Sequence, residues 1–354
     1  MRFGAVFSLA CLGATLALPA AAQTTGLAAD QTGLSPVRGT PVPAVRTPDP
    51  RGTISLMVDN DLFAGTDKNY TSGFQLDWRS PSYDPPRWLS AVTGRMSLIF
   101  PEGGTPRWGL SLGQNIFTPS DTLRRNPDPK DRPYAGWLFG SISLASYTAT
   151  SYGAIELQMG IVGPGALGRE TQNGVHRLLN IDRAYGWDHQ LKDEFGVNLI
   201  LARQWRWNYE TGISGLQYGF VPNLTASLGN VYTYASAGMM VRLGSNLNAD
   251  FGPPRTRPAQ SGSAFFQPES DGFGWYIFAG VEGRAVARNI FLDGNTWRDG
   301  PRVDRIPMVG DVNLGFALMW QRTRLTATYT IRSREFEAQG NGLQYGSVAV
   351  AFRF

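Results

Sequence analysis

The sequence predicts an all-β protein, a twelve-stranded antiparallel transmembrane β-barrel with long outer loops and one short loop helix. Apolar residues alternate with small or polar ones along many short segments. No segment after the N-terminus is long and apolar enough for a membrane helix. A membrane protein without such helices must close its sheet into a barrel, because lipid offers no partner for backbone polar groups.

Residues 1–22 have the features of a secretory signal peptide. A basic residue near the start is followed by an apolar segment and then by three alanines before Gln23. Cleavage there would remove Cys11, the only cysteine of the chain, so the mature protein would have neither a disulfide nor a thiol nucleophile. We therefore expect a protein that works outside the cytoplasm.

The mature chain divides into a lead-in and one large domain. Residues 23–52 are rich in Pro, Thr, Gly and Ala and have no strand pattern, so we expect a flexible periplasmic lead-in. Residues 53–354 are enough for one barrel domain. Alternating segments begin near positions 53, 71, 107, 136, 152, 193, 210, 229, 273, 308, 324 and 343. This even number suits a closed antiparallel barrel.

The cleanest alternation lies near the C-terminus. One face of 310–320 carries the large apolar residues Val312, Leu314, Phe316, Leu318 and Trp320. The other face carries small or polar residues, which predicts an apolar outer wall and a polar lumen. The next segment repeats this pattern after a tight turn, and the last one ends on Phe354, as bacterial outer-membrane barrels do.

The lengths of the connections orient the barrel. The very short joins lie near Thr150, Asn208 and Arg322. The long joins lie at 60–70, 117–135, 163–191 and 288–307. Because outer-membrane barrels have short periplasmic turns and long outer loops, we expect the long joins to face outward. Two further long joins, at 80–106 and 244–272, fall on the periplasmic side and have no explanation in the sequence.

The positions of the tryptophans and the excess of arginine over lysine both carry information. Most tryptophans lie toward segment ends, which predicts interfacial girdles that include Trp137. Of the 32 basic residues, only Lys68, Lys130 and Lys192 are lysines. A guanidinium binds phosphate in a bidentate way, which suits a protein among phosphorylated glycolipids, although high-GC codon bias gives the same excess.

Polar residues end the first predicted strand. Alternation with the apolar residues of 54–58 places Asn60 on the outer wall and directs Asp59 and Asp61 toward the lumen. Thr71 begins the next strand. Such an Asx-rich loop can simply cap its own turn. Its Asp and Asn oxygens also suit calcium, so a cation site is the alternative.

Two long loops carry basic residues. The loop at 117–135 contains adjacent Arg124 and Arg125, with Lys130 and Arg132 further on. Basic residues in a surface loop usually serve solubility, and anion capture is the sharper alternative.

The loop at 163–191 contains both histidines, His176 and His189. Residues 170–180 can form a short helix on which Gln172 and His176 share one face. Histidine is the natural base near neutral pH, although a lone histidine is usually structural or merely exposed. A serine nucleophile has no motif behind it, because no GxSxG or HExxH occurs.

Three separated motifs resemble one known family. The pattern NDxxxxxxxxYTSG, the loop TPSDTLRR, and GPGALGRETQNGVHRLL followed by GWDHQL and DEF are similar to the outer-membrane lipid A 3'-O-deacylases, the LpxR family. The resemblance covers most of the chain from Ile54 to Phe354. It implies a twelve-stranded barrel that removes the 3'-linked acyloxyacyl group of lipid A with Ca2+. It also implies a bacterial outer-membrane location, with the active site toward the outer leaflet and lipopolysaccharide as substrate.

The resemblance further implies which residues form the site. Asn60, Asp61 and Thr71 would line it, with Asn60 and Asp61 as metal ligands. Gln172, as a substrate-binding residue, and His176 would face them from the loop helix. His176 would take a proton from water, and the hydroxide would attack the ester carbonyl. Calcium would stabilise the oxyanion that forms.

Two positions depart from the family pattern. Arg124 falls where the family has a lysine, and Asp182 falls where it has a glutamate. Both keep the charge, but Arg does not replace Lys at a close site, and Asp is one methylene shorter. Arg124, next to Arg125, would hold a phosphate or sugar oxygen of the substrate. Asp182 would orient the imidazole of His176.

Two other functions compete with the deacylase. A non-catalytic channel or structural barrel would explain the alternation and the terminal Phe354, but not the joint occurrence of the polar loop residues. A barrel phospholipase would use similar physics, but no serine stands in a recognisable motif. We expect a monomer in the outer membrane that has no nucleic-acid partner.

Overall fold

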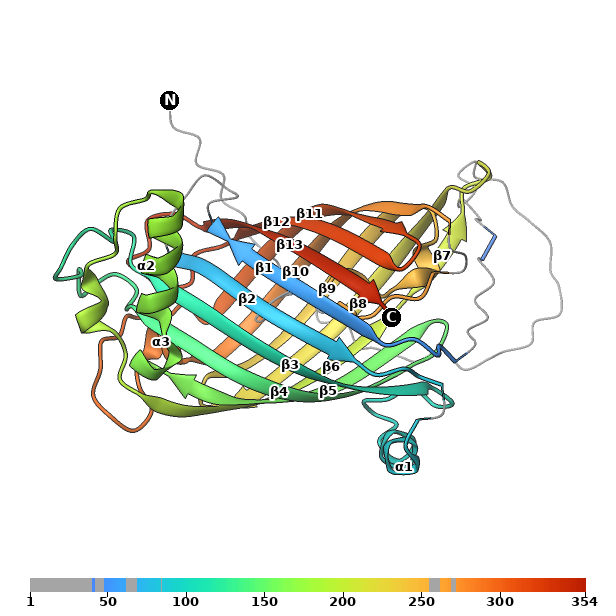
Figure 1. The fold of residues 1–354 in the computed structure, drawn as a ribbon, viewed down its shortest axis with the longest axis horizontal. Helices are drawn as coiled ribbons and strands as arrows, with labels where there is room; N and C mark the ends of the chain where they lie inside the picture. The colour runs from blue at the N-terminus through green and yellow to red at the C-terminus, as the bar shows by residue number, and fades with distance from the viewer. Residues whose placement is uncertain (1–39, 42–47, 62–68, 84, 255–261, 269–271) are drawn as a thin grey trace, which may run out of the picture. The chain divides into compact units, whose positions relative to one another are not determined.

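The computed structural model describes residues 40–41, 48–61, 69–83, 85–254, 262–268 and 272–354 (Figure 1). The predicted signal peptide and most of the predicted lead-in lie outside these residues. The described residues contain thirteen strands in one antiparallel sheet. Their bounds are β1 Thr53–Asn60, β2 Asn69–Arg79, β3 Thr105–Thr118, β4 Ala135–Tyr147, β5 Ser151–Val162, β6 Glu194–Trp205, β7 Trp207–Glu210, β8 Gln217–Gly229, β9 Tyr232–Gly244, β10 Gly274–Asn289, β11 Met308–Trp320, β12 Thr323–Arg332 and β13 Leu343–Arg353.

The sheet closes into a barrel with twelve positions around its wall. β1 pairs with both β2 and β13, and β6 pairs with both β5 and β8. The short β7 continues the line of β6 after Arg206 and pairs with the same neighbour, β8. The predicted twelve-stranded antiparallel barrel is therefore confirmed. The short join predicted near Asn208 is wrong in detail, because Asn208 lies within β7 and the turn follows at 211–216.

The wall has the predicted apolar outer face. In β11 the outward residues Leu314 and Phe316 are 48% and 41% exposed, while the intervening lumenal positions are mostly buried. Neighbouring strands continue this exposed apolar face, since Leu314 lies opposite Ala279 of β10 and Tyr329 of β12. Lipid contact would remove this surface from water, which contributes roughly 25 cal/mol for each Å2.

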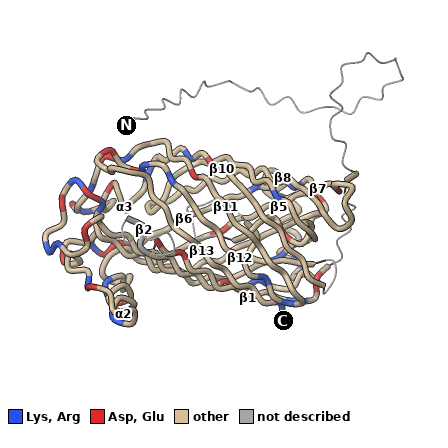
Figure 2. Tube along the Cα trace, turned by 90° about the horizontal axis from the view of Figure 1, so that it is seen from above, with Lys and Arg blue, Asp and Glu red and all other residues tan. Residues whose placement is uncertain are grey.

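The two ends of the barrel differ, and we name them by their connections. The loop end holds the described connections 119–134, 163–193, 290–307 and 333–342, and the turn end holds 148–150, 211–216 and 321–322. The loop end carries the helices η2 Pro164–Ala166, α2 Gly168–Leu179, η3 Gly186–His189 and α3 Ile290–Asp293. The predicted loop helix is thus found as α2. Charged residues gather most densely at the loop end (Figure 2).

One long connection at the turn end folds into the lumen. The described parts of 245–273 include η4 Leu247–Ala249 and bury Asp250 and Phe266 completely. Asp250 accepts hydrogen bonds from Arg242 at 2.9 Å and from Arg324 at 2.7 Å. Burial alone would raise the pKa of Asp250, but Arg324 and Arg242 outweigh it and hold this pKa below its ordinary value. This plug explains the join at 244–272.

The other long connection at the turn end covers the outer wall. It contains α1 Arg87–Arg95, from which Leu89 is fully buried, and it continues to the buried Phe100. Gly153 of β5 faces this segment, and a Cβ there would lie 1.8 Å from the carbonyl oxygen of Ile99. The join at 80–106 is therefore an external cover that requires a glycine beneath it.

The end of the predicted lead-in lies against the turn end. Asp49 is 1% exposed and forms ion pairs with Arg107 at 2.8 Å and with Arg353 at 2.9 Å. Its backbone N–H donates to Ser82. Asp49 thus ties the chain entering the barrel to β3 and to β13.

Aromatic side chains occupy the lumen at the loop end. The short helix α3 carries Phe291 inward, where it stacks on Phe117 with ring centroids 4.1 Å apart. Trp137 stacks on Phe139 beside them. Trp137 is 1% exposed and faces the lumen, so its predicted place in an interfacial girdle is wrong. Trp137 occupies a lumen-facing position of β4, so its side chain cannot reach the membrane interface.

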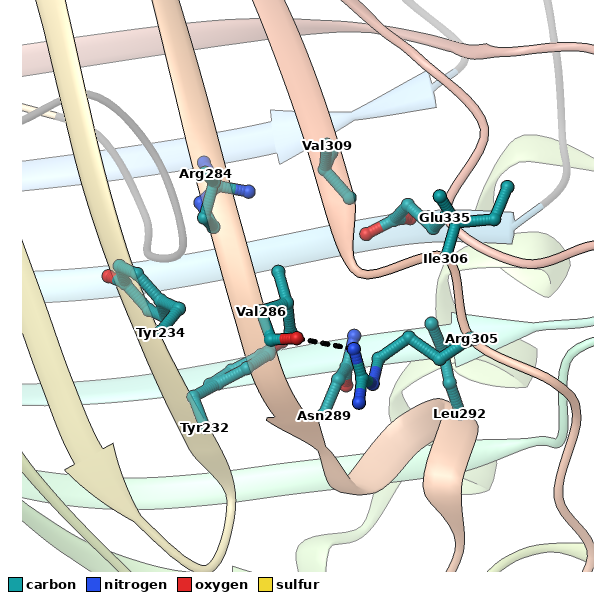
Figure 3. Close-up of a pocket in the computed structure, with 10 residues that line it drawn as sticks. All are labelled: Tyr232, Tyr234, Arg284, Val286, Asn289, Leu292, Arg305, Ile306, Val309 and Glu335. Atoms are coloured by element: carbon teal, nitrogen blue, oxygen red, sulfur yellow. Dashed lines mark hydrogen bonds between the residues drawn. The ribbon is translucent and has the colours of Figure 1, made fainter. Parts of the chain in front are cut away.

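Charged groups in the same part of the lumen are paired. Asp311 bridges Arg284 at 3.2 Å and Arg332 at 2.8 Å. Figure 3 shows Arg284 and Glu335 around a small cavity of about 10 Å3, with Arg305 bonded to a backbone oxygen of β10. No helix within the described ranges has the length and apolarity needed to cross a membrane.

Candidate active site

The helix α2 begins and ends at residues with left-handed backbone conformations. Leu167 precedes it at φ 59°, and Asn180 follows it at φ 57° with its N–H bonded to the carbonyl of Arg177. Asn is one of the few residues that adopt this conformation at low cost at a helix C-terminus. The buried face of the helix consists of Gly168, Gln172, Asn173 and His176.

This buried face of α2 lies on the outer wall of the barrel. Gln114 of β3 points outward and donates to the carbonyl of Ala166 at 2.6 Å. Gly136 of β4 also faces outward, and a Cβ there would lie 3.0 Å from the Cβ of Ala166. The segment that starts α2 therefore contacts the wall directly, and α2 lies outside the lumen.

The strap, residues 181–190, follows α2 and fixes its buried polar side chains. Trp187 packs against the outward-facing Ile116 of β3, and its indole N–H donates to Gln172 at 2.8 Å. Ala184 donates its backbone N–H to Asn173 at 2.9 Å. The sequence prediction omitted Asn173 and Trp187. The helical spacing of Asn173 relative to the buried face was the signal available for finding it.

The imidazole of His176 is buried between α2 and this strap. It is 3% exposed, and its Nδ1 lies 2.5 Å from the backbone carbonyl oxygen of Asp182. A carbonyl oxygen can only accept, so Nδ1 carries the hydrogen and Nε2 is left with the lone pair in the neutral ring. The carboxylate of Asp182 is exposed. The structure thus places the main chain of Asp182, and not its carboxylate, at the ring.

The first hairpin brings Asn60 to the same outer face. Asn60 of β1 lies opposite Ser72 of β2, and Ser72 lies opposite Ile116 of β3. Two strand spacings separate Asn60 from Ile116, which is about 10 Å along the wall. Trp187 packs on Ile116 and binds Gln172, so Asn60 lies in the row of the wall that α2 and its strap cover.

The neighbours of Asn60 have different positions. Asp59 is 1% exposed, as expected for a side chain directed toward the lumen, and Asp61, which follows β1, is fully buried. Thr71 lies at an irregularity of the β2–β3 register between Tyr70 and Ser72. The side chain of Thr71 lies outside the described part of the structure.

The two adjacent arginines lie in an exposed loop beside the strap. Arg124 is half-exposed and 3.9 Å from Asp128, an ion pair that solvent screens strongly. The guanidinium of Arg125 lies 5.9 Å from the ring centroid of Tyr185 in the strap. Both guanidinium groups are therefore near α2 and accessible to an anion.

Arg132 from the same loop has a structural role that its sequence context did not indicate. It is 1% exposed and donates to Glu335 at 2.5 Å. Burial would raise the pKa of Glu335, but Arg132 and then Arg332 hold it below its usual range. Arg132 thus fixes the loop that carries Arg124 to the loop between β12 and β13.

The donors at the end of β1 suit a hard cation. Asn60 and Asp61 offer amide and carboxylate oxygens, which calcium prefers. The side chain of Asp61 is fully buried. The described residues contain no group of three His, Cys, Asp or Glu side chains arranged around a metal.

Comparisons with known proteins bear on the family and the fold of this chain. The family model described as outer membrane protein LpxR matches residues 7–354. LpxR from Salmonella typhimurium has a TM-score of 0.70 at 20% identity, over 85% of this chain and 100% of that chain. The β domain of the Bordetella autotransporter Brka has a TM-score of 0.41 at 9% identity, over 85% of this chain and 98% of that chain. A search of the curated proteins gave no match.

The family match extends over almost the whole chain and includes every residue of the candidate site. The Salmonella structure shares the closed barrel. The predicted outer-membrane location and the predicted family are both confirmed. The chain belongs to the LpxR family of outer-membrane lipid A 3'-O-deacylases.

Proposed function

We propose that this deacylase removes the 3'-linked acyloxyacyl group of lipid A by calcium-dependent hydrolysis, with His176 as the general base on water. The supporting observation is the buried imidazole between α2 and the outer wall, whose Nδ1 is bonded to the main chain of Asp182. This bond leaves Nε2 as the basic nitrogen. The site lies on the lipid-facing side of the barrel, where a membrane ester can reach it.

The reaction follows from this tautomer. Nε2 of His176 accepts a proton from water while the water oxygen forms a bond to the ester carbonyl carbon. When the tetrahedral intermediate collapses, the bond between that carbon and the 3' oxygen breaks. The proton held on Nε2 passes to the leaving oxygen. One water is consumed, and a carboxylic acid and a 3'-hydroxyl group are produced.

The remaining predicted residues have supporting roles in this proposal. Gln172 holds the strap through Trp187 and so fixes the face of α2 that carries the imidazole. Arg124 and Arg125 bind phosphate or sugar oxygens of lipid A, because exposed guanidinium groups form charge-assisted hydrogen bonds with phosphate. Thr71 lines the site from β2.

Asn60 and Asp61 are the proposed calcium ligands from the protein. When bound, the cation supplies positive charge where the ester oxygen becomes negative. Asp182 orients the imidazole through its carbonyl oxygen, so an aspartate serves as well as a longer glutamate there. The substitution relative to the family pattern is then tolerated.

The channel alternative is disfavoured by the contents of the lumen. Aromatic residues around Phe117 and Phe291 occupy it at the loop end. The plug around Asp250 occupies it at the turn end, with Arg242 and Arg324 in contact. A solute path through the barrel would require these buried groups to separate.

Mass spectrometry of lipid A tests the proposal. Cells that express the wild type, His176→Ala or His189→Ala are compared with calcium or with a chelator. We expect His176→Ala to lower the rate by about 10²–10⁴-fold, as for loss of a general base. His189 is exposed and bonded to Asn126, so its replacement is the matched control.

Heat-modifiable electrophoretic migration verifies that each variant is folded and inserted. Full deacylation by folded His176→Ala would exclude the histidine mechanism. Full deacylation by the wild type in chelator would exclude the calcium requirement.

A further inference from the structure

A second feature of the loop end is a cleft on the outer wall beside β6. Its walls are Phe195 and Val197 of β6, Asn230 of the β8–β9 turn, and Trp297 and Arg298 of the loop between β10 and β11. Its volume is about 460 Å3. Phe195 is 65% and Trp297 is 77% exposed, so both aromatic surfaces are available to a ligand.

The loop that carries Trp297 is fixed by Glu194, the first residue of β6. Glu194 accepts from the backbone N–H of Thr296 at 2.8 Å and from the side chain of Asn230 at 3.1 Å. Arg288 donates to the hydroxyl of Thr296 at 2.8 Å. These hydrogen bonds hold Thr296, the residue before Trp297. The conformation of the loop therefore keeps Trp297 in its exposed position.

Positive charge lies directly above the cleft. A polar hollow of about 620 Å3 shares Trp297 and Arg298 with the cleft and adds Arg302. Both arginines are exposed, and no ion pair of either is found within the described residues. The carboxylates facing them are Asp293, which is paired with Arg305, and Asp299.

The carboxylates below the cleft are also engaged. Glu194 accepts hydrogen bonds from Thr296 and Asn230, and Asp193 accepts one from the backbone N–H of Gly165 at 2.7 Å. The two guanidinium groups thus face the hollow with one exposed carboxylate, Asp299, nearby. This arrangement favours an anion above the cleft and apolar groups within it.

We propose that this cleft binds a phosphorylated glycolipid of the outer leaflet, lipid A itself, and holds it beside the catalytic site. The proposal rests on lipid A as the substrate. The cleft is continuous with the lipid-facing wall through Phe195 and Leu199 of β6, so its occupant comes from the membrane. Acyl chains lie against Phe195 and Trp297, and phosphate oxygens bind Arg298 and Arg302.

The cleft and the helix of the candidate active site share a structural element. The short helix η2 binds the residue before β6 through Gly165 and Asp193, and it contacts β4 through Ala166 and Gly136. Binding in the cleft therefore increases the local concentration of lipid A next to α2. It acts on substrate capture and leaves the chemical step unchanged.

Binding of lipid A to purified protein in detergent, followed by native mass spectrometry, tests this site. All variants carry His176→Ala so that no hydrolysis occurs. We expect Trp297→Ala with Arg298→Ala to lower affinity on the order of tenfold, as for loss of aromatic and arginine anchors. The matched control is Trp320→Ala with Arg322→Ala, an exposed pair of the same types at the turn end.

Two further arms identify the ligand. Dephosphorylated lipid A is expected to bind more weakly to the parent protein and to lose its dependence on Arg298. Phosphatidylglycerol is expected to bind more weakly than lipid A. Equal affinity of the cleft variant and the control, or equal binding of phosphatidylglycerol and lipid A, would overturn the glycolipid site.

Steady-state kinetics in the catalytically competent chain separates this proposal from the mechanism. Loss of the cleft is expected to raise KM with kcat unchanged. A fall in kcat at constant KM would contradict a docking role. If the histidine mechanism failed, the His176→Ala chains would still release the 3' acyl group, and the native mass spectra would show that product separately from any loss of binding.

Discussion

The plug at the turn end and the outer wall beside α2 at the loop end bury polar groups in different ways. At the turn end, Asp250 lies between Arg242 and Arg324, so charge is neutralised by opposite charge at hydrogen-bond distance. At the loop end, His176 is bonded to a backbone carbonyl, and Gln172 to an indole N–H. The first arrangement closes the lumen, and the second fixes polar side chains against the outer wall.

This difference predicts which substitutions change the stability of the barrel and which change the reaction rate. A buried carboxylate held by two arginines has no remaining capacity to accept a proton near neutral pH, because its pKa is lowered. An imidazole fixed through Nδ1 is the group that the proposed mechanism uses for proton transfer. Substitutions at the turn end should therefore change stability, and substitutions around α2 should change rate.

The largest effect on stability is expected for Asp250→Ala. It leaves Arg242 and Arg324 buried without their carboxylate, which costs about 3–5 kcal/mol. Urea unfolding of the detergent-solubilised protein measures the shift. Asp299→Ala, an exposed aspartate, is the control. An unchanged unfolding midpoint in Asp250→Ala would mean that the plug does not contribute to barrel stability.

A smaller effect is expected for Gln172→Ala. It leaves the indole N–H of Trp187 buried without its acceptor, at a cost of about 1–3 kcal/mol. Because the strap then loosens, deacylation should fall roughly tenfold, equivalent to about 1.4 kcal/mol in the barrier. Leu178→Ala on the exposed face of α2 should retain full rate. Equal rates for both variants would remove Gln172 from the support of the site.

Arg124→Ala should affect the folded protein least among these substitutions. Its exposed ion pair with Asp128 contributes about 0.2–1 kcal/mol at most. If Arg124 binds substrate phosphate as proposed, KM should rise while the thermal midpoint stays constant. Arg334→Ala in another exposed segment of the loop end is the control for loss of charge. A constant KM would count against substrate binding by Arg124.

The stability of the plug around Asp250 should stay constant between pH 7 and pH 4. The pKa of Asp250 is lower in the folded protein than its ordinary value of 3.8, so its stabilising charge is fully present above that value. The stability is lost as pH falls below 3.8 through the folded pKa. Hydrogen exchange of the described segment 262–268 measures the opening. Opening above pH 5 would contradict the assignment.

The sequence was sufficient to predict the barrel wall, but not the residues that fill the lumen. Alternation and connection lengths were sufficient for twelve strands, because a residue period of two reports which face meets lipid. The plug around Asp250 and the inward turn of Trp137 depend on contacts between residues far apart in the chain. The burial of Arg132 likewise depends on Glu335, about two hundred positions away.

The candidate site was predictable to a similar degree. Helical spacing placed Gln172 and His176 on one face of α2, and alternation placed Asn60 on the outer wall. Spacing alone could not show that the carbonyl of Asp182, and not its carboxylate, meets the imidazole. That contact depends on how the strap returns over the helix.

The position of α2 on the outside of β3 and β4 determines by which route a membrane substrate would approach the proposed site. An amphiphile anchored in its monolayer can slide sideways to the imidazole and leave by the same route. Its hydrocarbon tails then never enter water, a transfer that would cost about 0.8 kcal/mol for each methylene. Under the proposed mechanism, the substrate would therefore reach His176 by diffusion within the plane of the membrane.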